Sequence, residues 1–181
     1  MDELTPLLLA AASGDRLALA NFVRRTQADV WRFMAHLVDP DAADDLTQEV
    51  YVRAIGSVAR FRGDASARTW LLSVARRVAA DEIRRRQRRR RIAGFETAAE
   101  GESAHADATG DVELHDLVDR LDHDRRIAFV LTQLLGLSYT EAAQACDVPI
   151  GTIRSRVARA RADLIAMLGA DDIDDERAVG G

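Results

Sequence analysis

The chain has 181 residues, 48% of them hydrophobic, which is enough for one ordinary domain or two small ones. Apolar residues recur at helical spacing with almost no alternating pattern, so the sequence predicts an all-α fold class. No apolar run approaches the roughly 18 residues of a membrane span and no signal peptide is visible, which predicts a cytoplasmic protein without a membrane segment. The one cysteine excludes an internal disulfide framework.

The net charge of −5 is unevenly distributed along the chain. Residues 1–91 hold 17 arginines against 12 acidic residues, and residues 148–168 hold four arginines against one acidic residue. Residues 92–111 hold five acidic residues and no arginine, and residues 169–181 hold five acidic residues and one arginine. Two basic regions separated by an acidic one indicate a polyanionic partner that the chain contacts at two places.

The first 58 residues are expected to form three helices. A short apolar helix near residues 3–13 ends at Gly14, and Asp15 can cap a longer helix that Asp39-Pro40 terminates. The third helix begins near residue 43. Its apolar residues that are expected to point inward are Leu46, Val50, Ala54, Ile55 and Val58.

A long basic helix is expected after the glycine-containing loop at residues 60–66. Ser66 can cap this helix, which continues into an arginine-rich run at residues 84–91. As part of the helix, the run would clamp phosphates without reading sequence, whereas as a frayed end it would be a basic arm.

Residues 92–111 contain Gly, Ser, Thr, Ala and acidic residues without an apolar stripe, so they are predicted to be a flexible acidic linker. Fully extended, about 20 residues span roughly 66–72 Å, the length of roughly 20 base pairs of DNA. The predicted organisation is two small helical domains, residues 1–91 and 112–168, joined by this linker and followed by an acidic tail, residues 169–181. The tail has too little apolar surface to order and is expected to be disordered.

Residues 138–165 are the most informative stretch, because they predict a helix-turn-helix after two helices near residues 112–121 and 123–135. Ser138 is placed to cap the first helix of the motif, and Val148-Pro149 cannot continue it. On a wheel of about 100° per residue, the apolar stripe of the second helix is Ile153, Val157, Ala160 and Leu164.

The opposite face of that second helix is polar and basic. It carries Thr152, Ser155, Arg156 and Arg159, and the stripe is flanked by Arg154 and Arg161. A helix that packs by one face and carries guanidinium groups on the other suits the major groove of DNA. An ordinary amphipathic surface helix is the alternative interpretation.

Three segments, in this order, resemble the extracytoplasmic-function group of bacterial sigma factors. They are ADDLTQEVYVRAI (43–55), RFRGDASARTWLLSVARRVAADEIRRR (60–86) and GLSYTEAAQACDVPIGTIRSRVARARADL (136–164). The similarity covers nearly the whole chain and is greatest to the actinobacterial sigma C type. The resemblance implies a protein that directs RNA polymerase core to promoters, reads the −35 and −10 elements and melts the −10 region, with no cofactor and no metal.

The first segment resembles the helix that binds the clamp helices of the polymerase β′ subunit. The residues assigned to this contact are Asp44, Asp45, Leu46, Gln48, Glu49 and Val50. An acidic face with a small apolar centre suits a basic coiled-coil partner, whereas a solvated helix face is the alternative.

The second segment resembles the region that melts and reads the −10 element. The residues assigned to DNA are Arg60, Arg62, Gly63, Asp64, Ser66, Arg68, Trp70, Arg76, Arg77, Asp81 and Arg84. The resemblance places a pocket for an unstacked base at residues 63–66, and Phe61 and Trp70 either stack on bases or belong to the core. Arg77 stands where the family often has an amide and Ala67 where it often has an aromatic residue, which leaves the base preference at −10 open.

The third segment resembles the helix-turn-helix that reads the −35 element. The residues assigned to DNA are Thr152, Arg154, Ser155, Arg156 and Arg159. An upstream apolar surface is expected to lie partly in the core and, by resemblance, partly against the polymerase β flap. It consists of Leu121, Ile127, Val130, Leu131 and Leu134.

Several hypotheses stay open at this stage. Control of such a chain would come from a separate anti-sigma factor, from its expression, or from occlusion between its two halves. The linker is either a solvated tether or a mimic of transcript charge in the RNA exit path of the polymerase. The acidic residues of that second hypothesis are Glu96, Glu100, Glu102 and Asp107.

Two other classes of protein would explain part of the sequence. A helix-turn-helix regulator that binds DNA without polymerase would explain residues 138–165 but not residues 43–86. A metal enzyme is suggested by His115 and His123, which lie near several aspartates, but no second cluster completes a coordination sphere. The sequence therefore predicts a protein that is not an enzyme.

Overall fold

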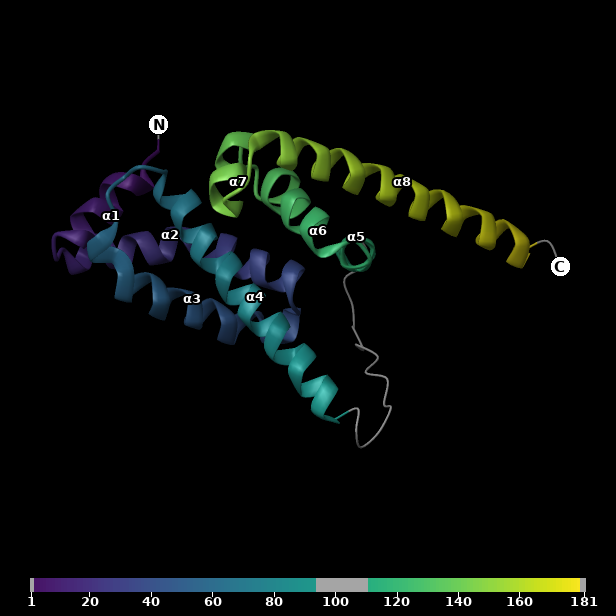
Figure 1. Cartoon of the computed structure of the whole chain (residues 1–181), viewed down its shortest axis with the longest axis horizontal. Helices are drawn as coiled ribbons and strands as arrows, with labels where there is room; N and C mark the ends of the chain where they lie inside the picture. Colours follow the sequence, from purple (N-terminus) through teal and green to yellow (C-terminus); the bar gives the residue numbers. More distant parts are fainter. Residues whose placement is uncertain (1, 94–110, 180–181) are drawn as a thin grey trace.

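The computed structural model describes residues 2–93 and 111–179, with side chains for residues 2–92 and 114–169. All regular elements in these ranges are helical, which confirms the all-α fold class (Figure 1). In chain order they are α1 (Leu4–Ala12), α2 (Arg16–Leu37), η1 (Pro40–Ala42), α3 (Ala43–Ser57), η2 (Val58–Arg60), α4 (Ala67–Ala93), α5 (Asp111–Asp119), α6 (His123–Phe129), η3 (Val130–Leu134), α7 (Tyr139–Cys146) and α8 (Ile150–Val179).

The N-terminal half is a bundle of α1 to α4 whose helix ends follow the sequence signals. Asp15 caps α2, because its carboxylate accepts hydrogen bonds from the backbone N–H groups of Leu17 at 2.8 Å and Ala18 at 3.0 Å. Helix α2 ends at Leu37, and its C-cap residue Val38 directly precedes Asp39-Pro40. The large side chains buried in this bundle include Leu8, Phe22, Phe33, Val50 and Leu71.

The C-terminal half consists of α5 to α8. Helix α6 continues directly into η3, a π-helical stretch in which the Leu135 N–H donates to the Val130 carbonyl at 2.9 Å. Helix α8 packs across both α6 and α7. The sequence predicted all of these helices, although it did not predict the π-helical stretch.

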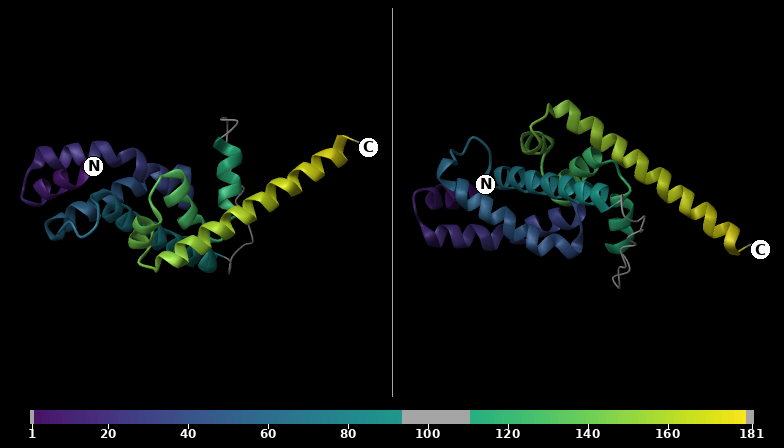
Figure 2. Two further views of the ribbon diagram at one scale, coloured as in Figure 1. Left: turned by 90° about the horizontal axis from the view of Figure 1, so that it is seen from above. Right: turned by 60° about the horizontal axis from the view of Figure 1, so that its bottom comes forward.

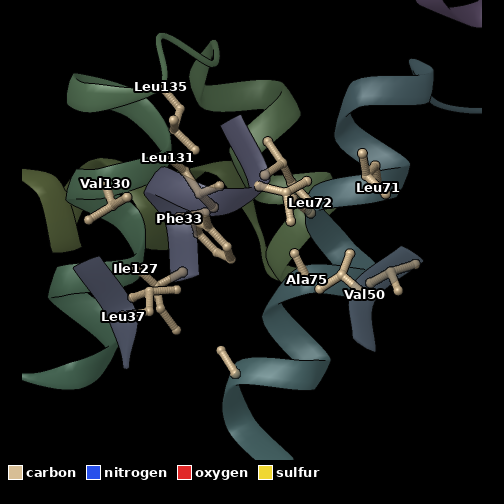
Figure 3. Close-up of a cluster of buried hydrophobic side chains, with 14 of the residues drawn as sticks. Phe33, Leu37, Val50, Leu71, Leu72, Ala75, Ile127, Val130, Leu131 and Leu135 are labelled. Atoms are coloured by element: carbon tan, nitrogen blue, oxygen red, sulfur yellow. The ribbon is translucent and has the colours of Figure 1, made fainter. Parts of the chain in front are cut away.

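The two halves also pack against each other. One continuous cluster of buried apolar side chains contains Phe33 and Leu37 from α2, Leu72 from α4 and Leu131 from η3 (Figure 3). Helix α7 lies against α4 in the same interface (Figure 1). Control by occlusion between the two halves requires them to be in contact, and this contact is present.

The C-terminal tail differs from expectation. The sequence predicted disorder from residue 169, but α8 continues to Val179 and projects away from the other helices (Figure 2). Extending an existing helix costs far less than nucleating one, and Gly169 is the main unfavourable residue in this extension. The predicted linker at residues 92–111 lies almost entirely outside the described residues, and so do the four acidic residues of the transcript-mimic hypothesis, Glu96, Glu100, Glu102 and Asp107.

Candidate nucleic-acid and polymerase interfaces

The helix-turn-helix is organised by a capping box at the start of α7. The Ser138 hydroxyl accepts from the Glu141 N–H at 3.2 Å, and the Ser138 N–H donates to the Glu141 carboxylate at 2.9 Å. The turn follows at Asp147, which has a left-handed backbone with φ 56° and ends α7 before Pro149. The cap and the break lie where the sequence predicted them.

The importance of the cap can be measured. Because an N-cap hydroxyl contributes about 1 kcal/mol, Ser138→Ala is expected to lower the free energy of unfolding by about that amount. Thr140→Ala is the matched control, since Thr140 is exposed two residues later and takes no part in the cap. Urea denaturation of both variants tests this, and equal stabilities would contradict it.

The first part of α8 packs by its apolar stripe. The exposed fractions of Ile153, Val157, Ala160 and Leu164 are 0%, 1%, 0% and 9%. This confirms the stripe that the sequence predicted. It also sets the orientation of the helix, because the residues opposite the stripe must then face away from the core.

The polar face of α8 divides into free and bonded side chains. Arg154, Ser155 and Arg159 are exposed. In the part of the chain that the structure describes, neither Arg154 nor Arg159 makes a hydrogen bond or ion pair. Arg156 instead forms an ion pair with Asp124 of α6, and Arg161 donates to the Gln133 amide oxygen at 2.6 Å. Of the predicted DNA-contacting arginines on this helix, Arg154 and Arg159 are therefore the free ones.

The arginines of α4 lie on two different flanks of that helix. At about 100° per residue, Arg68, Leu72 and Arg76 follow one flank, whereas Arg77 and Arg84 follow another. On the first flank, Arg68 donates to the Leu135 carbonyl at 2.6 Å and Arg76 to the Ala145 carbonyl at 3.1 Å.

These contacts cover one flank of α4 with the C-terminal half. Arg68 is further held by Asp29 of α2, at 2.7 Å. Arg77 and Arg84 remain exposed, and Arg77 has no partner among the described residues. The structure thus does not bring all predicted −10 residues onto one open surface.

The loop before α4 presents both polar and apolar groups. Arg60 and Arg62 are exposed, and Gly63 has φ +82°, a conformation that other residues rarely adopt. Phe61 is 7% exposed and packs on the half-buried Trp70, with ring centroids 5.4 Å apart. Phe61 is therefore a core residue in this structure, and Trp70 is partly one.

The Asp81 carboxylate is bonded to two arginines, which stabilise its charged form. Its carboxylate accepts hydrogen bonds from Arg53 of α3 and from Arg84, each at 2.6 Å. The bond from Arg53 and then the bond from Arg84 lower the pKa of the Asp81 carboxyl below its usual value. Asp81 thus ties α3 to α4 and orients Arg84.

The predicted polymerase-docking residues on α3 are divided between surface and core. Asp44, Asp45 and Gln48 are exposed, and Glu49 is half-buried. Leu46 and Val50 are 5% and 0% exposed, so their assignment as the apolar centre of that surface is wrong. They point inward because α3 packs against α2 and α4 on the side that carries them.

The apolar centre of the exposed α3 face consists of two other residues. Val52 is 72% exposed and Ile55 is 46% exposed. Both lie on the same side of the helix as Gln48 at about 100° per residue. Ile55 was expected to point inward, which is also wrong. The signal that would have found this pair is the full wheel of α3, on which Val52 and Ile55 lie on the side of Asp45 and Gln48.

Trp31 extends this surface onto α2. Its side chain is 38% exposed, and its indole Nε1–H donates to the Asp44 carboxylate at 2.9 Å. We define the docking surface as Trp31, Asp44, Asp45, Gln48, Val52 and Ile55. A partly exposed tryptophan beside exposed aliphatic side chains is typical of a protein interface.

The described residues contain neither a metal-binding cluster of side chains nor a helix that could span a membrane. There, no group of three or more His, Cys, Asp or Glu side chains is arranged to hold a metal ion. His115 contacts His36 of α2, with the two Nδ1 atoms 3.1 Å apart, and lies 3.7 Å from the Asp119 carboxylate. Over the same residues, none of the helices has the length and hydropathy needed to cross a bilayer.

Two protein-family models match the chain. The model for Sigma-70 region 2 matches residues 22–89, and the model for Sigma-70 region 4 matches residues 111–164. The first range covers α3, most of α2 and α4, and the loop between α3 and α4, and the second covers α5, α6, α7 and the packed part of α8. The predicted DNA-contacting residues on both α4 and α8 therefore lie within matched regions.

Similar proteins and structures agree with these models. The ECF RNA polymerase sigma factor SigC of Mycobacterium tuberculosis is 51% identical over 176 residues, 95% of each chain. The ECF RNA polymerase sigma-E factor of Escherichia coli K12 is 30% identical and covers 88% of this chain and 92% of that one.

Two solved structures have a similar fold. CnrH in complex with the cytosolic domain of CnrY has a TM-score of 0.72 at 27% identity, over 92% of this chain and 97% of that one. The sigma factor RpoE of Bartonella quintana, in complex with the anti-sigma factor NepR, has a TM-score of 0.73 at 27% identity. This match covers 84% of this chain and 98% of that one. The chain belongs to the extracytoplasmic-function sigma factors of bacterial RNA polymerase.

Proposed function

We propose that α8 reads the −35 element, that α4 and the loop before it read and melt the −10 element, and that the docking surface binds the β′ clamp helices of the polymerase core. As a family member, the chain initiates transcription at specific promoters with that polymerase. One observation carries the assignment of separate roles at −10 and −35. Two helices, α4 and α8, bear arginines, and each has its predicted DNA-contacting residues in a different matched region.

Helix α8 has the geometry of a recognition helix. It follows the turn at Asp147, packs by its apolar stripe, and exposes Arg159, Ser155 and Arg154 in its first three turns. An arginine that is free of protein partners can form a bidentate contact with a guanine edge or bind a phosphate. Arg156 is held by Asp124 and is expected to contribute through the position of α8.

Removing the free guanidinium of Arg159 is expected to weaken discrimination of the upstream element. One specific base contact is worth about 1–3 kcal/mol, roughly five- to 150-fold in affinity. Arg159→Ala should therefore reduce the preference of the holoenzyme for a promoter over the same promoter with a scrambled upstream element.

Arg16→Ala is the control, because Arg16 is also exposed but begins α2 in the other half. The measurement is competition binding of the two DNAs to each holoenzyme at a fixed salt concentration. An unchanged ratio of affinities for Arg159→Ala would contradict the assignment of α8.

The −10 assignment rests on α4 and on the loop at residues 61–66. Exposed arginines lie along both, and the helix continues through the arginine-rich run to Ala93. Since Arg68 and Arg76 are bonded to the C-terminal half, the two halves must separate before this flank of α4 meets DNA. We assign residues 1–91 to −10 recognition and core binding, and residues 112–168 to −35 recognition and to contact with the β flap.

The family and the fold support a proposal for the regulation and the location of the chain. One solved structure shows CnrH with the cytosolic domain of CnrY, and the other shows the sigma factor RpoE with the anti-sigma factor NepR. We expect a separate anti-sigma factor for this chain as well. The contact between α4 and α7 supports occlusion between the halves as a further control. The chain is expected to act in the cytoplasm, where polymerase is, and to carry out no catalysis of its own.

The rival function is a helix-turn-helix regulator that binds DNA without polymerase. Gel filtration of the full chain with bacterial core polymerase separates the two functions. The sigma-factor function predicts that the chain elutes with the core and that the complex footprints promoter DNA over both elements. Elution apart from the core, with DNA binding by the chain alone, would support the rival.

A further inference from the structure

The first turn of α4 receives hydrogen-bond acceptors from two places. The Ser66 hydroxyl accepts from the Thr69 N–H at 3.1 Å, as a local cap. The Ala67 N–H donates to the Thr5 hydroxyl at 2.9 Å, although Thr5 belongs to α1 and is 62 residues away in the chain. Helix α1 therefore supplies part of the N-terminal cap of the helix that begins at the −10 loop.

The Thr5 hydroxyl is itself held in place. It donates to the Asp2 carboxylate, which also accepts from the Leu4 N–H at 3.0 Å. Burial of the Asp2 carboxyl opposes ionisation, but the hydrogen bonds from Thr5 and from backbone N–H groups outweigh it and lower its pKa. The carboxylate thus stays charged, and a negative charge beside the N-terminus of α4 is favourable.

Helix α1 also lies against the loop itself. The Leu9 side chain is 4.0 Å from the point where a Cβ of Gly63 would lie, and α1 packs on both η2 and α4. At its own start α1 is tied to α2, because Glu3 forms an ion pair with Arg25 at 2.6 Å. One end of the loop, at Ala67, is thus hydrogen-bonded to α1, and its middle lies over α1.

We propose that Thr5 is a positioning residue for promoter melting: through its hydrogen bond to the Ala67 N–H, α1 holds the −10 loop in the conformation that captures an unstacked base. This inference rests on the proposed role of the loop in melting. It assigns a role in strand separation to a helix that precedes the matched Sigma-70 region 2, which begins at residue 22.

The physical argument is preorganisation. A flipped base binds in a pocket formed by the loop. If the loop becomes ordered only when the base binds, the cost of ordering it reduces the binding free energy. Losing one hydrogen bond at a helix terminus is worth a change of about three- to tenfold in an equilibrium. The loss should appear in strand opening, because Thr5 lies on α1 and forms no part of the docking surface on α2 and α3.

The experiment compares Thr5→Val, which keeps the shape and removes the hydroxyl, with Thr5→Ser, which keeps the hydroxyl. Full-length variants are assembled with core polymerase on duplex promoter DNA with 2-aminopurine in the −10 element, and fluorescence reports opening. Thr5→Val is expected to lower the ratio of open to closed complexes about three- to tenfold. Thr5→Ser should open the DNA like the original chain, and core affinity should be equal for all.

Ser13→Ala is the matched control, because the Ser13 hydroxyl bonds to the Leu9 carbonyl at the other end of α1. Equal opening by Thr5→Val and the original chain would overturn the inference, as would a Thr5→Val defect that Thr5→Ser shares or a parallel loss of core affinity. If Thr5→Val does not fold, Asp2→Asn replaces it, and a twofold or smaller change would overturn the inference. Failure of the original chain to open any promoter would instead refute the proposed melting function.

Discussion

Val52→Asp is expected to weaken the complex with core polymerase by about 30-fold or more, which corresponds to roughly 2 kcal/mol or more for the loss of a central interface residue. Val52 lies in the apolar centre of the docking surface, beside Ile55 and Gln48, and its side chain is 72% exposed in the free chain. An aspartate there would remove apolar contact area and would place an unpaired charge in a dehydrated interface. The measurement is a titration of labelled chain with core polymerase.

Leu17→Asp is the matched control for that experiment. Leu17 is 70% exposed at the start of α2, so the same change is made at an equally accessible aliphatic residue outside the docking surface. Both variants should keep the unfolding temperature of the original chain, because neither position is in the core. Equal core affinity for Val52→Asp and Leu17→Asp would show that the polymerase binds elsewhere.

The two halves are expected to move apart by tens of ångström when the chain binds polymerase and promoter. In the free chain, hydrogen bonds from Arg68 and Arg76 to the Leu135 and Ala145 carbonyls hold α4 against the C-terminal half. The fully extended linker would let the halves contact DNA elements up to nearly two turns apart, roughly 70 Å along the duplex. The halves cannot stay packed against each other and also contact two such distant DNA elements.

Spin labels at Arg24 on α2 and Ile165 on α8 would report this movement, since both positions are exposed and lie in different halves. Cys146, the one native cysteine, is buried and would first be replaced by serine. A label pair at Arg24 and Gln87, both in the N-terminal half, should keep its distance. An unchanged Arg24–Ile165 distance in the promoter complex would contradict the opening.

The helix-turn-helix could be predicted from the sequence because its determinants are local. The Ser138 cap, the break at Val148-Pro149 and the stripe that includes Ile153 and Val157 all act within a few residues. The π-helical stretch at residues 130–134 has no comparably clear local signal, and it was missed.

The docking surface could be predicted only in part. The acidic residues Asp44 and Asp45 were correctly placed on the surface, but the side of α3 that faces the core depends on how α2 and α4 pack against it. Leu46 and Val50 were correctly expected to point inward, yet they were also assigned to the polymerase contact, and Ile55 was wrongly expected to point inward. The contribution of Trp31 was missed for a related reason, because its partner Asp44 lies on a different helix.

Contacts distant in sequence were the least predictable. Nothing near Arg68 or Arg76 indicates a carbonyl partner in the other half, 67 and 69 residues away. The same holds for Thr5 and Ala67, whose hydrogen bond is visible only once α1 and α4 are folded together. In each case the side chain is one that forms hydrogen bonds, but tertiary packing determines which group it bonds to.

The central claim is that this chain gives core polymerase its promoter specificity through two separate DNA contacts. Transcription of a promoter library by core polymerase, with and without the chain, tests it most directly. We predict transcripts that depend on the chain and start downstream of two short enriched sequences, and loss of the upstream enrichment with Arg159→Ala. Transcript starts that are the same with and without the chain would contradict the account.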